Sequence, residues 1–221
     1  MFVRDFMTPD PLTITLETSH PDAVALMRQH RIRRLPVMNK ARLVGIVSQQ
    51  DLLSNEPSPA SSLSVYEIYA LMEKLQAKDF MVHPVITVEG DCPIEDAVCI
   101  MVTRKIGCLP VVDGPRLVGI ITETDIFRAL VDVLGGKDGG LRVVVRGVPD
   151  RVGELARLTG DIAAIGGNIS AITTSEQLGA STVKVTGVSE AALRGLLDKR
   201  GLEVVDLRPF SPYTPKMCGE P

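Results

Sequence analysis

The sequence predicts a mixed α/β (α+β) chain, in which two β-α-β-β-α units precede a ferredoxin-like β-α-β-β-α-β unit. Two observations predict this fold class. When the sequence is shifted by 74 positions, residues 3–53 align with residues 77–127 without a gap, and 18 of the 51 positions are identical. A glycine-rich stretch at 135–140 then precedes a segment whose apolar spacing alternates between strand and helix periods.

Each repeat begins with a short strand and a helix. Leu12–Thr15 and Ile86–Glu89 are expected to form the strands, and apolar residues at helical spacing predict helices over 20–31 and 94–105. Two β-branched runs joined by turn-forming residues then predict a hairpin in each copy. The runs are Leu35–Met38 and Leu43–Val47 in the first copy, and Leu109–Val112 and Leu117–Ile121 in the second.

Each repeat ends on the pattern Ser/Thr-x-x-Asp, which is expected to begin a final helix. The pattern contains Ser48 and Asp51 in the first copy, and Thr122 and Asp125 in the second. A helix start offers free N–H groups to a phosphate, and the carboxylate can accept hydrogen bonds from a ribose diol. The same spacing is also that of a capping box, which stabilises a helix without any ligand. The residues alone leave both interpretations open.

The connecting segments predict the domain organisation. A polar stretch at 56–62 separates the repeats, and Ser64 is expected to cap a helix over Val65–Gln76 that covers the module or pairs with its mate in a dimer. The expected boundaries are a first repeat at 1–60, a linker helix at 61–76, a second repeat at 77–134, a glycine-rich linker at 135–140, a third domain at 141–208 and a disordered, proline-rich tail at 209–221.

The third domain is expected to follow the order β-α-β-β-α-β. A turn at 149–154 leads into its first helix, and Gly166-Gly167-Asn168 ends that helix. The expected elements are strands at Leu141–Arg146, Ile169–Thr174, Ser181–Thr186 and Leu202–Leu207, and helices at 153–165 and 189–199.

Composition excludes several classes of function. The net charge of −3 disfavours nucleic acid and anionic membranes as partners, and no apolar run is long enough to span a bilayer. The four cysteines lack metal-type spacing and are expected to be core thiols in a reducing, cytoplasmic compartment. No catalytic constellation, GxGxxG motif or P-loop is present, so we expect no enzyme, no metal and no required cofactor.

The motifs Leu-Pro-Val, Leu-Val-Gly-Ile and Ser/Thr-x-x-Asp resemble the CBS domain, and over residues 1–132 they occur in tandem, as in a Bateman module. The resemblance implies a homodimer whose repeats bind an adenosyl ligand, namely AMP, ADP, ATP or S-adenosylmethionine, in clefts between them. The residues it implies for that site are Thr13, Ile14, Arg33, Arg34, Pro36, Ser48 and Asp51 in the first repeat, and Thr87, Val88, Cys108, Pro110, Thr122 and Asp125 in the second.

The two clefts are not expected to be equivalent. Arg33 and Arg34 precede the first Leu-Pro-Val, whereas Gly107 and Cys108 precede the second. Two adjacent cations facing a cleft could neutralise phosphate oxygens. They could equally form a solvated helix end that complements the helix dipole, and both interpretations remain open.

Residues 141–208 resemble the ACT domain through the stretch Val148–Leu155 and the later Gly167-Asn168-Ile169. The resemblance implies side-by-side pairing and possible amino-acid binding at the interface. The alternative is that Asp150 is only an N-cap, Gly153 only a turn residue, and the domain serves dimerisation. The residues carried over are Asp150, Arg151, Val152, Gly153, Asn168 and Ile169.

The order CBS–CBS–ACT is similar to that of the acetoin-utilisation regulatory proteins of bacteria. We therefore expect a ligand-responsive regulator that binds an adenosyl ligand and acts on a partner that the sequence does not identify. The alternative is a constitutive dimeric interaction or scaffold protein with no bound ligand. A third interpretation, nucleic-acid binding through residues 28–34, is opposed by the acidic net charge.

Overall fold

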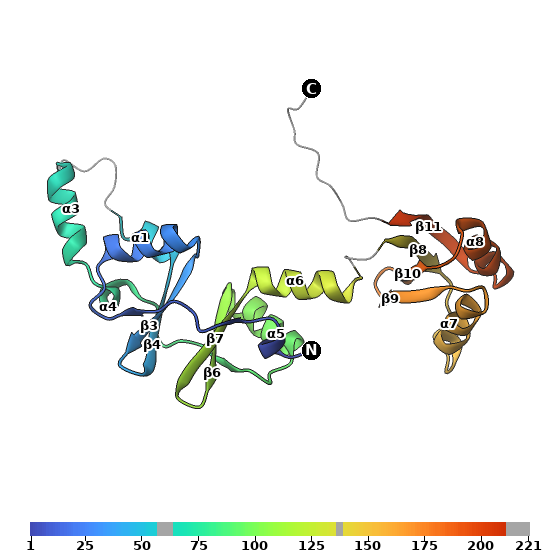
Figure 1. The fold of residues 1–221 in the computed structure, drawn as a ribbon, viewed down its shortest axis with the longest axis horizontal. Coiled ribbons are helices and arrows are strands. Elements are labelled where there is room, and N and C mark those ends of the chain that lie inside the picture. Colours follow the sequence, from blue (N-terminus) through green and yellow to red (C-terminus); the bar gives the residue numbers. More distant parts are fainter. Residues whose placement is uncertain (57–63, 136–138, 211–221) are drawn as a thin grey trace, which may run out of the picture. The chain divides into compact units, whose positions relative to one another are not determined.

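The computed structural model describes residues 1–56, 64–135 and 139–210. These residues form two compact units that divide after Phe127, and each unit is described by itself. The first unit, Met1–Phe127, contains the first repeat and the second repeat as far as the start of its last helix, and Figure 1 shows it in blue to green.

The first repeat has the predicted order β-α-β-β-α. Its sheet has the strand order β2-β3-β4, in which β2 is parallel to β3 and β3 forms an antiparallel hairpin with β4. Leu35, Val37 and Val47 of this hairpin are fully buried in the core. The elements are β2 (Ile14–Thr15), α1 (His20–His30), β3 (Arg34–Asn39), β4 (Arg42–Ser48) and α2 (Gln49–Ser54).

The second repeat has the same order and the same register. Val37 pairs with Gly45 in the first repeat, and Val111 pairs with Gly119 in the second, with an irregularity directly after both pairs. The first strand of each repeat is two residues shorter than predicted, because only its last two residues pair with the hairpin. The elements are β5 (Val88–Glu89), α5 (Ile94–Arg104), β6 (Cys108–Asp113), β7 (Arg116–Thr122) and α6 (Glu123–Val133).

The segment that opens each repeat packs on the other repeat, which the sequence did not predict. β1 (Thr8–Pro9) pairs with β7, and Val82 bridges to Ile46 of β4. Two further short helices lie in these segments, η1 (Val3–Asp5) and α4 (Ala77–Phe80). The exchange of segments joins the two repeats into one unit.

Two methionines lie where the exchanged segments cross the hairpins. A Cβ built on Gly45 would overlap the Met81 side chain, and one built on Gly119 would overlap the Met7 side chain. Glycine at these two positions therefore permits the close packing of each segment on the other repeat.

The linker helix α3 (Val65–Lys74) begins at the predicted cap. Ser64 and Glu67 form a capping box, and the hydrogen bonds from Ser64 lower the pKa of the Glu67 carboxyl. The helix ends two residues before the prediction because Leu75 adopts an extended conformation.

The third domain has the predicted element order and an antiparallel sheet with the strand order β11-β8-β10-β9. Its two helices pack with the buried strand residues in one core. β11 includes Pro209 and Phe210, two residues of the predicted tail, because both pair with β8; residues 211–221 lie outside the described residues. The elements are β8 (Gly140–Arg146), α7 (Glu154–Ala164), β9 (Asn168–Ser175), β10 (Ala180–Thr186), α8 (Glu190–Lys199) and β11 (Glu203–Phe210).

The cysteines do not all lie in the core. Cys108 is buried, Cys92 is half-buried and Cys99 is exposed, and Cys218 lies outside the described residues. Of the three cysteines that the structure describes, only Cys108 agrees with the expectation of core thiols. Within the described ranges, no helix is long and apolar enough to cross a membrane.

Candidate functional site

Strand register places two predicted site residues side by side in each repeat. In the first repeat, Arg34 at the start of β3 pairs with Ser48 at the end of β4. In the second, Cys108 pairs in the same way with Thr122. Each hairpin therefore brings one of its predicted residues to the start of the helix that follows.

In both Ser/Thr-x-x-Asp segments the aspartate is held by hydrogen bonds at the start of a helix, and Ser48 and Asp51 form a full capping box. Asp51 Oδ2 accepts hydrogen bonds from the Ser48 backbone N–H at 2.7 Å and from the Ser48 hydroxyl at 2.6 Å. Asp125 Oδ2 accepts from the Thr122 N–H at 2.9 Å and from the Thr122 hydroxyl at 2.7 Å. Asp51 therefore caps α2, and Asp125 accepts the corresponding hydrogen bonds from Thr122 at the start of α6. Both carboxylates are fixed in place by the chain itself.

The guanidinium of Arg34 reaches from the first repeat to the second, where it lies against Gly107 and near the Cys108 thiol. A Cβ on Gly107 would approach Arg34 Nη2 to 2.7 Å and Glu123 Oε2 to 3.2 Å. The small residues Gly107 and Cys108 therefore leave room for Arg34. This packing gives a physical reason for the asymmetry between the repeats.

The Cys108 thiol lies between opposing electrostatic influences. Burial is the largest and raises the pKa of this thiol, while the neighbouring Arg34 guanidinium lowers it; the carboxylates of Glu123 and Asp51 raise it again. The raised pKa keeps Cys108 a neutral thiol at physiological pH.

Arg33 and Arg34 do not face one cleft. Arg34 lies at the junction of the repeats, whereas Arg33 lines a separate cavity between α1 and α2. Neighbouring residues at the start of an extended segment point in opposite directions, so the two cations diverge. Of the two interpretations, the one in which both cations face one cleft is therefore wrong.

The remaining predicted residues of the repeats fall into two groups. Ile14, Val88, Pro36 and Pro110 are buried, so their side chains serve the core. Thr13 and Thr87 are exposed. Thr87 lines a cavity of about 790 Å³.

This large cavity lies between the two repeats. Arg42, Leu43 and Val44 contribute to it from the first repeat. The segment 83–87 and the second hairpin contribute from the other side. It is a hollow of the size that ligand pockets usually have, and it is lined by both copies.

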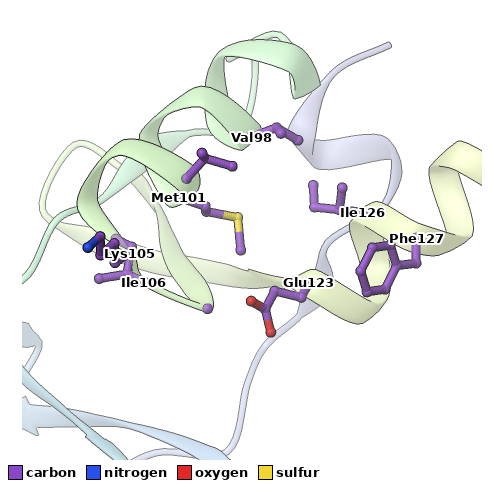
Figure 2. Close-up of a pocket in the computed structure, with 9 residues that line it drawn as sticks. Val98, Met101, Lys105, Ile106, Glu123, Ile126 and Phe127 are labelled. Carbon is purple, nitrogen blue, oxygen red and sulfur yellow. The ribbon is translucent and has the colours of Figure 1, made fainter.

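Two further cavities are equivalent under the 74-residue repeat. The first, of about 390 Å³, lies between α1 and α2, and the second, of about 440 Å³, between α5 and α6. Figure 2 shows Met101, Glu123 and Phe127 around the second cavity. Every residue that lines the second cavity lies 74 positions after a residue that lines the first: Val98, Met101, Val102, Lys105, Ile106, Gly107, Glu123, Ile126 and Phe127.

The ligand residues predicted in the third domain are separated into two groups. Asp150, Arg151, Val152 and Gly153 belong to the turn before α7, and Asn168 and Ile169 begin β9 after that helix has ended. The 11-residue α7 is about 16 Å long, so the two groups lie near its opposite ends. A single chain does not bring them together.

Gly153, and not Asp150, is the N-cap of α7. It has a φ of 87°, a left-handed conformation that favours glycine, and no atom lies within 4 Å of the place where a Cβ would be. The interpretation of Gly153 as a turn residue is confirmed, whereas that of Asp150 as an N-cap is wrong. The open space at Gly153 leaves the backbone accessible.

The model of the CBS domain matches residues 3–57 and 77–132, which together make up half of the chain. The chain belongs to the CBS-domain family. The two matched segments contain the two repeats, so the tandem CBS pair predicted from the internal repeat is confirmed.

Relatives of the CBS pair match about three fifths of this chain. The uncharacterized protein MJ1426 of Methanocaldococcus jannaschii is 32% identical over 155 residues, which cover 59% of this chain and 92% of that protein. The structure of an acetoin utilization protein (AcuB) from Vibrio cholerae is 32% identical, covers 59% of this chain and 90% of that one, and has a TM-score of 0.50. A structure of CBSX2, an Arabidopsis thaliana protein, in complex with AMP is 32% identical, covers 59% and 96%, and has a TM-score of 0.48.

Sequence reasoning missed several residues of the CBS pair and of the third domain. Arg28 and Arg31 line the first helical cavity, and the 74-residue offset could have revealed them as a difference between equivalent positions. Arg200 forms ion pairs with Glu154 at 3.2 Å and with Asp161, and so joins the end of α8 to α7. No sequence signal identifies Arg200, because its partners lie 39 and 46 positions away.

Proposed function

We propose that this protein is a cytoplasmic regulatory sensor that binds an adenosine nucleotide or S-adenosylmethionine between its two CBS repeats. The observation that carries the proposal is the convergence of predicted residues from both copies where the repeats meet. These residues are Arg34, Ser48, Asp51, Cys108, Thr122 and Asp125.

The proposed chemistry follows from the fixed aspartates and the single cation. Asp51 Oδ2 is held by Ser48, and Oδ1 would accept hydrogen bonds from the ribose diol. The Arg34 guanidinium would neutralise a phosphate oxygen. The second repeat carries Cys108 at the position of Arg34, so the two clefts would differ in affinity for a charged ligand.

Calorimetric titration of the full chain with AMP, ATP and S-adenosylmethionine tests the proposal. We expect micromolar binding of at least one ligand, weakened about 10-fold or more by Asp51→Asn or Asp125→Asn. Asparagine retains an acceptor oxygen for the cap while removing the charge that binds the ribose.

A matched control separates ligand binding from helix capping. Glu67 occupies the corresponding position of the capping box on α3, so Glu67→Gln removes a capping charge outside the repeat junction. This variant should bind like the wild type. No heat with any of the three ligands, or equal weakening by Glu67→Gln, would contradict the proposal.

We propose further that the third domain is an ACT-like regulatory module. Its element order and the exposed turn at Gly153 support this assignment. Because Asp150 and Asn168 lie near opposite ends of α7, an amino acid could contact both groups only if a second copy supplied one of them. The module would then act as a homodimer. Similarity to the Vibrio cholerae protein suggests acetoin utilisation as the process in which to seek a regulated partner.

A constitutive interaction protein is the second candidate, and α3 favours it. Tyr66, Tyr69 and Leu71 of this helix are exposed, whereas Met72 is buried. Exposed aromatic residues of this kind are typical of protein interfaces. An ordered dimer that depends on Tyr66 and Tyr69 but binds none of the three adenosyl ligands would support this candidate.

A further inference from the structure

The two equivalent cavities have similar apolar floors and different rims. Met27 and Met101 occupy the same place in the two floors, and both are buried. The rim of the first cavity carries three arginines, Arg28, Arg31 and Arg33. At the equivalent positions the second cavity has Val102, Lys105 and Gly107. Because the second cavity has the equivalent helices without arginines at these positions, the three arginines are not needed to form such a cavity.

The three arginines are not neutralised by neighbouring carboxylates. Throughout the part of the chain that the structure describes, no ion pair within 4.0 Å involves Arg28, Arg31 or Arg33. Glu56 lines the same cavity without forming such a pair. Three cations and one carboxylate leave an excess of two positive charges around one hollow.

The position of the arginines does not by itself account for this excess. Arg28 lies in the last turn of α1 and Arg31 is its C-cap, so the helix dipole stabilises them in part. The dipole is equivalent to about half a negative charge, which is smaller than the excess. Arg33 lies beyond the helix. Arg28, Arg31 and Arg33 are exposed, so water and counterions screen this charge, and an anion in the cavity would take their place against three guanidiniums.

We propose that the cavity between α1 and α2 binds a phosphate monoester carried on a small apolar body. Such a group has a charge of about −1.5 to −2 at pH 7, which matches the excess. The guanidiniums of Arg28, Arg31 and Arg33 would hold the phosphate oxygens in bidentate fashion. The apolar body would contact Val24, Met27 and Leu52. This site is distinct from the cleft proposed for the adenosyl ligand and does not depend on it.

Phenyl phosphate is a suitable probe because it joins a phosphate monoester to an apolar ring and contains no adenosine. Titration of the full chain, followed by ³¹P NMR, should show saturable binding. The triple variant Arg28→Val, Arg31→Lys, Arg33→Gly gives the first cavity the rim of the second repeat, and should weaken binding by at least 10-fold. Saturable binding that this variant leaves unchanged would overturn the proposal, as would no binding at all.

Two further variants guard against loss of folding. Arg28→Ala changes a single exposed residue and should weaken binding about 3-fold or more, with an unchanged circular dichroism spectrum. Lys105→Ala alters the second cavity and should leave binding unchanged. Equal weakening by Arg28→Ala and Lys105→Ala would overturn the assignment to the first cavity.

Two competitors identify the ligand chemistry and the site. Phthalate carries two carboxylates of the same total charge on the same ring, and should bind at least 10-fold more weakly than phenyl phosphate; equal affinity would overturn the assignment to phosphate.

Asp51→Asn should leave probe binding unchanged. Loss of the probe in Asp51→Asn, together with its displacement by AMP, would place it in the nucleotide cleft and overturn the proposal. Failure of AMP to bind at all would contradict only the nucleotide proposal.

Discussion

Arg34 and Cys108 occupy the same position in the two repeats, yet the guanidinium of one lies near the thiol of the other. The arginine of the first copy fits at the junction because Gly107 and Cys108 of the second copy are small. An arginine at both positions would place two cations together in a partly buried space, which is costly. The two repeats therefore fit together because one has an arginine at this position and the other has a smaller residue.

The Cys108 thiol should resist alkylation, whereas Cys99 should react. Burial raises the pKa of Cys108 and shields its sulfur, and Cys99 is exposed. At pH 8 we expect iodoacetamide to modify Cys99 at least 10-fold faster than Cys108, as measured by mass spectrometry of tryptic peptides. Similar rates for the two residues would contradict the buried environment of Cys108.

The same thiol should contribute to the alkaline dependence of stability. Its folded pKa lies above the ordinary value of 9.0, so the unfolded chain loses this proton first as the pH rises. The contribution of Cys108 is therefore fully present below pH 9 and is lost as the pH rises through the folded pKa. The difference in free energy of unfolding between wild type and Cys108→Ala should be smaller at pH 10 than at pH 8. A constant difference would contradict this assignment.

Replacement of the capping aspartates should destabilise the CBS pair even without ligand. Asp51→Ala removes the acceptor for two hydrogen bonds from Ser48 and should cost about 0.5–2 kcal/mol. Asp125→Ala should cost more, about 1–3 kcal/mol, because Asp125 is only 4% exposed. Urea denaturation of the apo protein measures both effects, and asparagine variants should recover part of the loss. An unchanged midpoint for both alanine variants would contradict the capping geometry.

Met81 packs so closely on Gly45 that adding a single methyl group at position 45 should lower the stability of the protein. Gly45→Ala should destabilise by about 1–3 kcal/mol, because the added Cβ would overlap Sδ and Cγ of Met81. A double-mutant cycle with Met81→Ala should show that the cost depends on that methionine.

Gly160 provides a matched control for this substitution. It lies within α7, and no atom is within 4 Å of the position of a Cβ. Gly160→Ala should therefore stabilise by about 0.5–1 kcal/mol, since alanine favours the helix. The same sign for Gly45→Ala and Gly160→Ala would contradict the predicted steric cost.

The ion pairs of Arg200 should stabilise the third domain. Its side chain is 18% exposed and contacts Glu154 and Asp161, so Arg200→Met should cost about 1–3 kcal/mol. Arg157 also pairs with Glu154, but its side chain is 69% exposed, and Arg157→Met should cost less than about 1 kcal/mol. Thermal unfolding measures both. A larger loss of stability in Arg157→Met than in Arg200→Met would contradict the prediction that the less exposed ion pair stabilises the domain more.

Much of the fold could be predicted because its information is local and repeated. Apolar, β-branched runs joined by turn residues set β3, β4, β6 and β7 to within about one residue, and Ser64 marked the start of α3. The short strand β1 and the helix α4 were missed, because β1 gains its partner from the other repeat and α4 has only four residues. Patterns within one segment carry no information about a partner far along the chain.

The sequence by itself determined that one β-α-β-β-α unit occurs twice, that the last helix of each copy begins after Ser48 or Thr122, and that a β-α-β-β-α-β domain follows. Only the tertiary structure decided that Arg33 and Arg34 diverge, one into a cavity between helices and the other to Cys108. It also decided that Asp150 and Asn168 lie apart. The physical reason is that hydrophobic periodicity and capping act over a few residues, whereas the direction of a side chain across a junction depends on the space that distant residues leave for it.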